Sequence, residues 1–314
     1  MTQPLPSNQD HSLIDIVILA YNEEIHIARA IETASTLTNN IFVIDSYSSD
    51  RTTEIARSLG ATVLQNEFVN QAKQFNWALD NAPLTSKWVM RLDADEVLEP
   101  TLIAEIRTIL PDLGPEITGI NLKRKHIFMG RWVKHGDRYP LVMLRIFRRG
   151  YGRAEDRWMD EHIAVLRGST ITLSGSFSDW NLQSLSHFVQ KHNAYATREA
   201  VELLNSKLHF FEDASLLTRS NSSGQAAFKR RIKEHVYNRI PFPVSSTAYF
   251  FYRYFLRLGF LDGKEGLIYH FLQGCWYRFL VGAKELELRR QIASMDDKQE
   301  MKKKLSELTG LRLE

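Results

Sequence analysis

The sequence predicts an α/β protein, with a mostly parallel sheet flanked by helices and a helical region after it. Three observations predict this class. The 314 residues are 44% hydrophobic and 25% charged, the balance of a globular chain with a sizeable core. From Ser12 to about Val165, short apolar runs rich in β-branched residues alternate with segments of helical period, as in βα units. Beyond them strands become hard to find, and Gln183–Lys207 and Gln225–Glu287 have helical patterns.

Within the first part, each apolar run is too short for a helix and most of them end in polar residues. The clearest predicted strands are Leu13–Leu19, Asn40–Ile44, Ala61–Leu64 and Lys87–Leu92. A helix is expected after Ser49, because Asp50 can accept a free N–H of its first turn and Gly60 can end it in a left-handed conformation.

The ends and the overall charge exclude some classes of protein. The first twelve residues, MTQPLPSNQDHS, lack the basic and apolar segments of a signal peptide, so we expect a flexible tail over residues 1–12. The net charge is only +3, which argues against a nucleic-acid partner. The single cysteine, Cys275, cannot form an internal disulfide and fits a reducing compartment.

The C-terminal region is unusually aromatic, with 12 aromatic residues in the 31 residues of Tyr249–Phe279. The stretch Gly266–Ala283 has little charge but contains His270, Gln273 and Arg278, which are costly at a bilayer centre, so no membrane span is predicted. The preceding segment, Phe228–Arg239, has five Lys or Arg against one Glu. This combination suits an anionic membrane interface. A second apolar core with a solvated basic face is the alternative.

Acidic residues follow the fourth predicted strand. The segment VMRLDADEV places Asp93, Asp95 and Glu96 at the carboxyl end of the strand, where open α/β sheets bind ligands. Two carboxylates separated by one residue can reach one divalent cation, and their hard oxygens suit Mg²⁺ or Mn²⁺, which bridge to phosphates. A cap or a solvated turn is the alternative for Asp-x-Asp alone. The position after an apolar strand favours the cation.

Two other predicted strands also end in polar residues. Asp45 ends NIFVI, and a carboxylate there can accept an N–H from a base or the hydroxyls of a ribose. The first strand ends in Ala20, Tyr21 and Asn22, followed by Glu23. None of the GxGxxG, GxxxxGK[ST] or GxSxG motifs occurs at these junctions, which argues against dinucleotide binding, a P-loop and a serine-hydrolase elbow. A nucleotide held by acids and a metal is predicted.

Four segments carry a family resemblance: AYNEE at Ala20–Glu24, DSYSSDRT from Asp45, QAKQFNWAL at Gln71–Leu79 and DADE at Asp93–Glu96. In order and spacing they resemble the nucleotide-sugar-binding half of family 2 glycosyltransferases, which have the GT-A fold. Further similarity, at Gly130–Gly150 and Asp156–Ile163, points to the branch of lipopolysaccharide-core and envelope-polysaccharide β-glucosyltransferases. The resemblance covers about the first 205 residues.

The resemblance implies roles for individual residues. Asp45 would read the uracil edge, Asp93 would lie near the ribose and the metal, and Asp95 would hold the metal. Mn²⁺ or Mg²⁺ would neutralise the charge that develops on the departing UDP. The residues implied in nucleotide-sugar binding are Ala20, Tyr21, Glu23, Asp45, Lys73, Asn76, Arg91 and Asp93.

An inverting transfer needs a base that removes the proton of the acceptor hydroxyl. In the MDEH segment the candidates are Asp160 and Glu161. Glu161 is favoured because relatives often read V-H-E there, but Asp160 stands where a His is common, so the choice stays open. His187 is a candidate to complete the metal shell.

The segment LRIFRRG adds arginines. On a strand, Arg145 and Arg149 share one face and Arg148 faces the other. Guanidinium groups bind diphosphates in a bidentate manner, so one face can hold the donor, with Arg145 and Arg148 as candidates. A solvated edge strand guarded by charge is the alternative.

Together these features predict an inverting, metal-dependent glycosyltransferase. It would move a hexose from a UDP-sugar to a lipid-linked saccharide in the synthesis of lipopolysaccharide, O-antigen or exopolysaccharide, and lie peripherally on the cytoplasmic face of the inner membrane. The predicted domains are a GT-A domain over residues 13–185 and a helical region over 186–314. A sugar nucleotidyltransferase is one alternative, although the loop after the first strand lacks its glycines. A non-catalytic carbohydrate-binding protein is the other, although the acids Asp93, Asp95 and Glu161 are intact.

Overall fold

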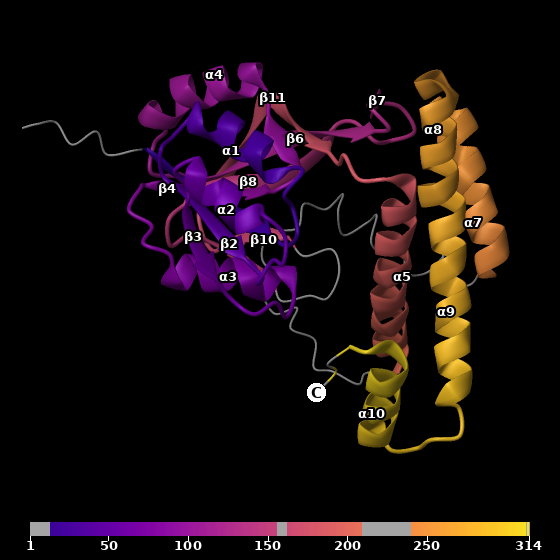
Figure 1. Ribbon diagram of the computed structural model, residues 1–314. Helices are drawn as coiled ribbons and strands as arrows, with labels where there is room; N and C mark the ends of the chain where they lie inside the picture. The colour runs from indigo at the N-terminus through magenta and orange to yellow at the C-terminus, as the bar shows by residue number, and fades with distance from the viewer. Residues whose placement is uncertain (1–12, 156–161, 209–239, 312, 314) are drawn as a thin grey trace, which may run out of the picture. The chain divides into compact units, whose positions relative to one another are not determined.

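The computed structural model describes residues 13–155, 162–208, 240–311 and 313 (Figure 1). Contacts divide the chain into two compact units. The sheet unit contains the chain up to Arg124, Val142–Ala154 and Ile163–Asp179; the helical unit contains mainly Lys125–Leu141 and Trp180–Glu314. The expected boundary between residues 185 and 186 stays a prediction.

The main sheet is mixed and has the strand order β3-β2-β1-β4-β8-β6-β11-β5. Strands β1 to β4 pair in parallel, whereas β8 is antiparallel to β4 and β5 is antiparallel to β11. The strands are β1 (Ile14–Ala20), β2 (Ile41–Asp45), β3 (Thr62–Gln65), β4 (Trp88–Asp93), β5 (Glu96–Leu98), β6 (Ile117–Phe128), β8 (Leu141–Arg148) and β11 (Ser169–Trp180). In addition β7 (Arg131–Val133) pairs with β6, and β9 (Gly152–Ala154) with β10 (Ile163–Val165).

The four predicted strands are confirmed to within one residue at each end. Nearly every residue of β1, β2 and β4 is buried, as expected for parallel strands covered on both faces. The predicted helix signals are confirmed too: Asp50 Oδ1 accepts the N–H of Thr52 at 3.0 Å, and Gly60 has φ +83°.

Helices cover both faces of this sheet. Helices α1 (Ile27–Ser35) and α4 (Pro100–Ile109) contribute to the core on one face, with inward residues of β1 such as Ile16 and Ile18. Helix α3 (Gln71–Asn81) packs on the opposite face against residues such as Val17. Neighbouring residues of β1 thus point to opposite cores, because side chains alternate along a strand. The shorter helices of this unit are α2 (Thr52–Ser58) and η1 (Leu110–Asp112).

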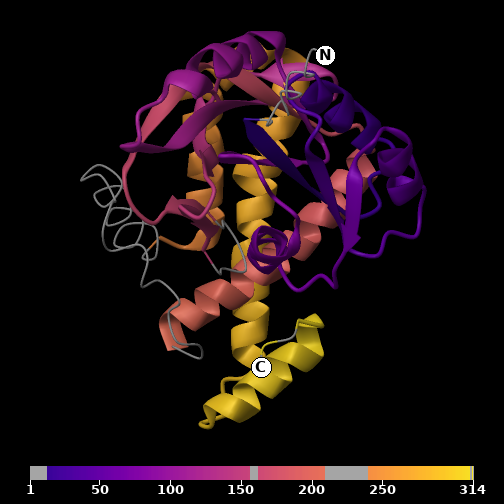
Figure 2. The ribbon, with the colours of Figure 1, turned by 90° about the vertical axis from the view of Figure 1, so that its left-hand side faces the viewer.

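The helical unit confirms the expected helical, aromatic-rich C-terminal region. Its long helices α5 (Leu185–Leu208) and α9 (Tyr277–Gln291) pack side by side (Figures 1 and 2). The other elements are α7 (Phe242–Phe251), η4 (Tyr252–Leu256), η5 (Gly259–Asp262), α8 (Gly263–His270), η6 (Phe271–Trp276) and α10 (Lys298–Thr309). Within the described residues, none of the helices has both the length and the apolar character that crossing a bilayer requires.

Candidate active site

Three strand ends meet at one edge of the sheet unit. Strand β1 lies between β2 and β4, and the register pairs Ala20 with Asp45 and Leu19 with Asp93. The predicted nucleotide-site residues Ala20, Asp45 and Asp93 therefore end adjacent parallel strands at almost the same level. This is the carboxyl edge at which open sheets bind ligands.

Hydrogen bonds connect the loops that follow β1 and β2. The N–H of Asn22 donates to Ser48 Oγ at 2.8 Å, and Asn22 Oδ1 accepts the N–H of Ser49 at 2.9 Å. One residue further, the N–H of Glu23 donates to Thr52 Oγ1 at 2.7 Å. The Glu23 carboxylate lies 2.5 Å from Nδ1 of the buried His26. These bonds organise the loop pair before any ligand arrives.

Two exposed tyrosines flank this loop pair. Tyr21 is 59% exposed and Tyr47 is 60% exposed. Tyr47 also has φ +59°, a left-handed conformation that costs a bulky residue about 1–2 kcal/mol. Strain of this kind concentrates at functional sites. Sequence analysis missed Tyr47, although a lone aromatic residue within the polar loop DSYSSDRT was a usable signal.

Asp45 is fully buried at the end of β2. Its carboxylate accepts the N–H of Ser48 at 3.0 Å, the Ser48 hydroxyl and the Gln65 side-chain amide at 3.0 Å. Asp45 thus shapes the loop that carries Ser48 and Tyr47. Its expected contact with a uracil edge stays a prediction.

Asp93, at the end of β4, is ionised by its surroundings. Its carboxylate oxygens lie 3.2 Å from Arg91 Nε and 3.3 Å from Arg145 Nη2. Burial by itself would raise the pKa of Asp93, but these two guanidinium groups hold it well below its usual range. The predicted residues Arg91, Asp93 and Arg145 are therefore brought together as one charged group.

Glu96 completes this group and was not assigned a role from the sequence. One of its oxygens accepts the Asp93 N–H at 2.9 Å, and the other lies 2.5 Å from Arg145 Nη2. Burial raises the pKa of Glu96, and the charge of Asp93 acts in the same direction, while Arg145 opposes both. Glu96 closes the DADE turn on itself. The position of Glu96 in the DADE motif was the sequence signal that could have identified its role.

Asp95, between Asp93 and Glu96 in the chain, is half-buried. Burial lowers the pKa of Arg29, and the negative charge of Asp95 opposes this effect only in part. Asp93 and Asp95 present hard carboxylate oxygens from one turn, which is the donor type that Mg²⁺ and Mn²⁺ prefer. Among the described residues, no group of three or more His, Cys, Asp or Glu side chains is placed to hold a metal ion. The expected role of Asp93 and Asp95 as metal ligands stays a prediction.

Helix α3 carries Lys73 and Asn76, which are predicted to contact the nucleotide-sugar. The Lys73 side chain is exposed, while its N–H is capped by Asn70 Oδ1 at 2.7 Å. The Asn76 amide donates to the carbonyl of Ala154 at 2.9 Å and accepts the N–H of Ala154 at 3.0 Å. Asn76 thus connects α3 to β9, and the contact of Lys73 with the donor stays a prediction.

The expected alternative of a solvated edge strand for LRIFRRG is wrong, because β8 lies between β4 and β6 and buries both Arg145 and Arg148. Arg148 donates to the carbonyls of Ile117, Leu113 and Gly114 at 2.6–2.9 Å. The guanidinium group of Arg148 therefore fixes the backbone that leads into β6. Its expected contact with a diphosphate stays a prediction.

The expected base and the third metal ligand are not tested by this geometry. Asp160 and Glu161 lie outside the described residues. His187 lies exposed on α5 of the helical unit, where its N–H donates to Ser184 Oγ at 3.2 Å. All three roles stay predictions.

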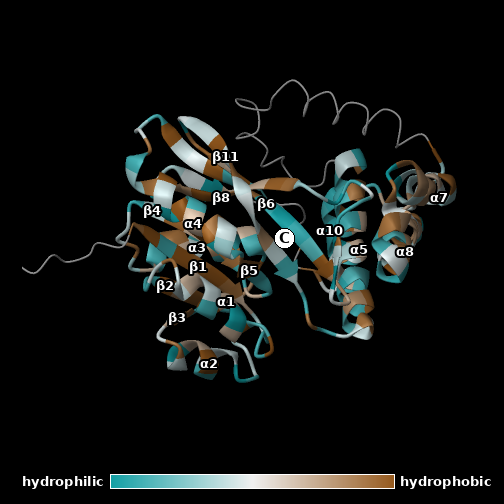
Figure 3. Ribbon diagram, turned by 90° about the horizontal axis from the view of Figure 1, so that it is seen from above, coloured by the Kyte–Doolittle hydropathy of each residue, from teal (hydrophilic) through white to brown (hydrophobic). Residues whose placement is uncertain are grey.

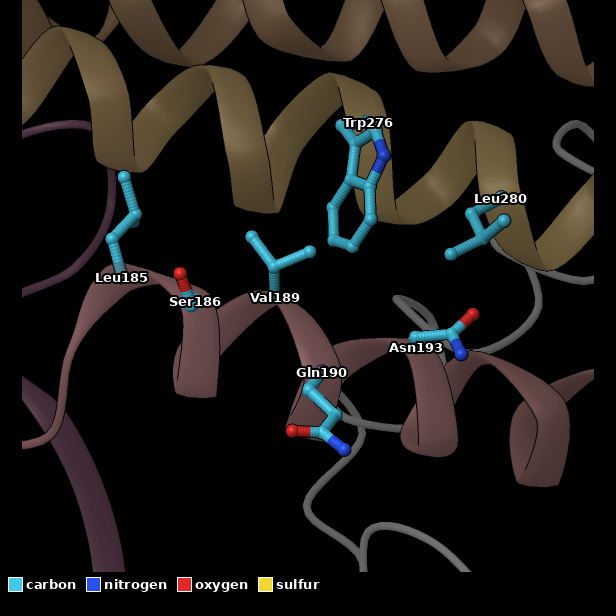
Figure 4. Close-up of a pocket in the computed structure, with 7 residues that line it drawn as sticks. All are labelled: Leu185, Ser186, Val189, Gln190, Asn193, Trp276 and Leu280. Atoms are coloured by element: carbon cyan, nitrogen blue, oxygen red, sulfur yellow. The ribbon is translucent and has the colours of Figure 1, made fainter.

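Two hollows lie apart from the predicted site residues. One, of about 590 Å³ in the helical unit, is lined by apolar and polar side chains of α5 and of η6–α9. Trp276 lies near Val189, and Leu280 lies opposite Asn193 (Figure 4). The other, of about 240 Å³, lies beside Leu79 and Arg153 in the sheet unit. Neither includes a residue of the strand-end edge.

Comparison with known proteins supplies the family. A family model described as glycosyl transferase family 2 matches residues 15–177. An uncharacterized glycosyltransferase of Rickettsia prowazekii (strain Madrid E) is 35% identical over 205 residues, which cover 61% of this chain and 68% of that protein. One of Rickettsia typhi is 36% identical over 96 residues, so the matched part spans only 32% of that relative's length.

Solved structures also match. Glucosyl-3-phosphoglycerate synthase from Mycobacterium tuberculosis, in complex with Mn²⁺, uridine diphosphate and glucosyl-3-phosphoglycerate, is 23% identical with a TM-score of 0.31. The match covers 37% of this chain and 44% of that chain.

Proposed function

Since the chain belongs to glycosyl transferase family 2 and is a glycosyltransferase, we propose that it moves a hexose, with inversion, from a UDP-sugar to a lipid-linked saccharide. One observation carries the proposal: β2, β1 and β4 end side by side in Asp45, Ala20 and Asp93. These strand ends, with the exposed Tyr21 beside them, form the edge where we place the nucleoside diphosphate.

The donor binds along this edge. Its base stacks on the exposed ring of Tyr21, its uracil edge meets Asp45, and its ribose hydroxyls reach Asp93. The exposed ammonium group of Lys73 adds a cation for the diphosphate. The loop hydrogen bonds between Asn22 and Ser48 favour affinity, because a preorganised loop loses little entropy on binding.

Asp95 and Asp93 would hold a Mn²⁺ or Mg²⁺ ion together with the diphosphate. When bound, the cation supplies positive charge to the leaving UDP. Arg145 and Glu96 keep Asp93 in place: Arg145 pairs with its carboxylate, and Glu96 accepts its N–H. An ionised Asp93 is available across the neutral pH range because its pKa is held low.

The acceptor hydroxyl attacks the anomeric carbon from the face opposite the diphosphate. Glu161, or alternatively Asp160, takes the hydroxyl proton on a carboxylate oxygen as the new bond forms. The acceptor is a saccharide on a lipid carrier or lipid A core in envelope polysaccharide synthesis. The protein works at the cytoplasmic face of the inner membrane, as the basic segment Phe228–Arg239 and the aromatic helices of the C-terminal region favour.

A donor screen tests the proposal. The full chain is incubated with a panel of UDP-, GDP- and dTDP-sugars, with Mn²⁺, with Mg²⁺ or with a chelator, and release of the nucleoside diphosphate is measured. We expect release from one UDP-hexose that needs the metal. Pyrophosphate formation from a nucleoside triphosphate and a sugar phosphate would instead indicate the nucleotidyltransferase, and binding without release under every condition would contradict a catalytic role.

A further inference from the structure

The helical unit exposes a contiguous apolar surface at the turn between α7 and α8. We call residues 251–261, which join these helices, the hairpin tip. Six of its eleven side chains are large, apolar and exposed, among them Leu256 at 75% and Phe255 at 50%. The exposed apolar residues of the tip are Phe251, Phe255, Leu256, Leu258, Phe260 and Leu261.

Ring contacts join these side chains into one surface. Phe251 stacks on Phe255 with ring centroids 5.6 Å apart. The half-buried Tyr254 contacts Phe255 at 5.1 Å and Phe260 at 6.3 Å, so the two arms of the tip meet through its ring. Val244 on α7, Leu267 on α8 and Phe271 on η6 are also exposed. Hydrophobic residues, coloured brown, recur along α7 and α8 (Figure 3). Large apolar surfaces of this kind mark interaction sites.

The inner side of the tip is polar and firmly held. Arg253 is buried and donates from Nε to the carbonyl of Gly136 at 2.9 Å. Arg257 Nε and the Tyr252 hydroxyl both donate to the Asp137 carboxylate, at 2.6 Å and 3.0 Å. At the end of the tip, the buried Asp262 accepts the N–H of His135 at 2.8 Å. The polar groups thus fix the shape of the tip while the apolar groups face out.

The turn itself presents a leucine to solvent. Leu258 has φ +60°, a left-handed conformation that is unfavourable for its side chain, and it is 47% exposed. The next residue is a buried glycine, and a Cβ at Gly259 would lie 2.7 Å from the ring of His270. The close approach at Gly259 fixes the backbone, and Leu258 is then directed outward at the apex. An exposed, strained leucine has no value for stability in water.

We propose that the hairpin tip binds a lipid bilayer by inserting these six apolar side chains into the interface between headgroups and acyl chains. The sequence of the tip, FYRYFLRLGFL, mixes aromatic and aliphatic residues and has no Asp or Glu. Lys264 on α8 is an exposed cation beside the tip and matches anionic headgroups. Arg257 and Arg131 are exposed too, although they pair with Asp137 and Glu265. Aromatic rings with flanking cations are the composition of interfacial membrane anchors.

The charge of the neighbouring sequence favours the same partner. The basic segment Phe228–Arg239, which lies outside the described residues, precedes α7 in the chain and adds positive charge that attracts anionic lipid. A protein partner would not need this combination of cations and exposed aromatic rings. The inference rests on the proposed function only in that a lipid-linked acceptor explains why the enzyme binds a membrane. Bilayer binding itself requires neither donor nor acceptor.

The test is flotation of the full chain with vesicles of phosphatidylethanolamine and phosphatidylglycerol, without substrates. Leu256→Asp and Phe255→Asp place a charge on the inserted surface, and each should lower the bound fraction about tenfold. Leu308→Asp is the matched control, because Leu308 is an exposed leucine on α10, away from the tip in the chain, and this variant should bind like the unchanged protein. Circular dichroism and thermal unfolding verify that all three variants fold.

The outcomes separate this inference from the proposed function. Equal loss of binding in all three variants, or no loss in the tip variants, would overturn the inference. Absence of vesicle binding by the unchanged chain, with a dimer that the tip variants convert to monomer in size-exclusion chromatography, would assign the surface to a second copy. UDP release from the donor without acceptor is measured in parallel: its absence rejects the proposed function, whereas vesicle binding decides the inference.

Discussion

The sheet edge buries charged side chains, whereas the hairpin tip exposes large apolar ones, and both arrangements are unusual. At the edge, charged groups such as Glu96 and Arg145 are buried, and they are paired with each other. At the tip, large apolar groups such as Phe255 and Leu256 are exposed. Charged residues are rarely buried and large apolar patches are rarely exposed, so both regions are kept for reasons other than packing. The donor edge that we propose thus lies in the sheet unit, and the membrane surface that we propose lies in the helical unit.

The largest expected effect lies at the sheet edge. Asp95→Ala should lower sugar transfer about 10³-fold, because charge on the leaving diphosphate is no longer neutralised. The melting temperature should change little, since Asp95 is only half-buried. Asp112→Ala, which removes an exposed acid from η1, is the control. Near-normal turnover of Asp95→Ala would remove the metal role from this residue.

The buried ion pairs of the edge should dominate its stability. Arg145→Met leaves Glu96 and Asp93 without their shared cation, and we expect a loss of about 3–5 kcal/mol in the free energy of unfolding, measured with urea. Arg153→Met breaks an exposed pair with Asp80 and should cost less than about 1 kcal/mol. Similar losses in the two variants would show that burial does not distinguish the pairs.

The identity of the base is decided by two isosteric variants. Glu161→Gln should lower kcat about 10²-fold or more with donor affinity largely kept, because proton removal is lost while the donor edge is unchanged. Asp160→Asn should retain most of the turnover. If Asp160→Asn is the variant that loses turnover, Asp160 and not Glu161 is the base.

A buried histidine gives the helical unit a pH dependence. Burial, the nearby Arg253 and, less strongly, Arg138 lower the pKa of His270 to about 4. The negative charge of Asp262 opposes this shift. The unfolded chain takes up this proton near pH 6.5 and the folded chain only near pH 4, so stability is lost as the pH falls through this window. We expect a loss on the order of 3 kcal/mol, at 1.36 kcal/mol per pKa unit.

Thermal unfolding of the protein and of His270→Gln from pH 7 to pH 4 measures the effect. Carboxyl groups titrate in both proteins, so the difference between the two curves isolates His270. The variant should lose less stability on acidification. Parallel curves would show that His270 does not titrate differently in the folded and unfolded chains.

The smallest expected effect concerns strain at Tyr47. Tyr47→Gly relieves a left-handed tyrosine and should raise the free energy of unfolding by about 1 kcal/mol. The same variant should bind UDP several-fold more weakly, measured by calorimetry, if the exposed ring helps hold the donor. A gain in stability with unchanged UDP affinity would leave Tyr47 without a role at this edge.

Sequence analysis identified the family and the α/β class with its helical, aromatic-rich end, and both are confirmed. It also identified the acids of the edge, because a buried strand that stops in Asp45 or Asp93 is visible in local periodicity. It did not identify the partnership of Arg145 with Glu96. That pairing depends on β8 lying beside β4, which joins residues 49 positions apart in the chain. The role of Arg148 in holding backbone carbonyls was hidden for the same reason.

The sequence by itself determined the first four strands, the helical end of the chain and the chemical groups at the ends of those strands, because backbone propensity and apolar spacing act over a few residues. It did not predict β11, which lies in the segment where strands were hard to find. Only the tertiary structure decided which of those groups are charged, strained or exposed. Asp93 is held ionised by two arginines, and Leu258 faces outward because Gly259 packs against His270. Ionisation and exposure depend on neighbours brought together from distant parts of the chain, and local sequence patterns do not encode those neighbours.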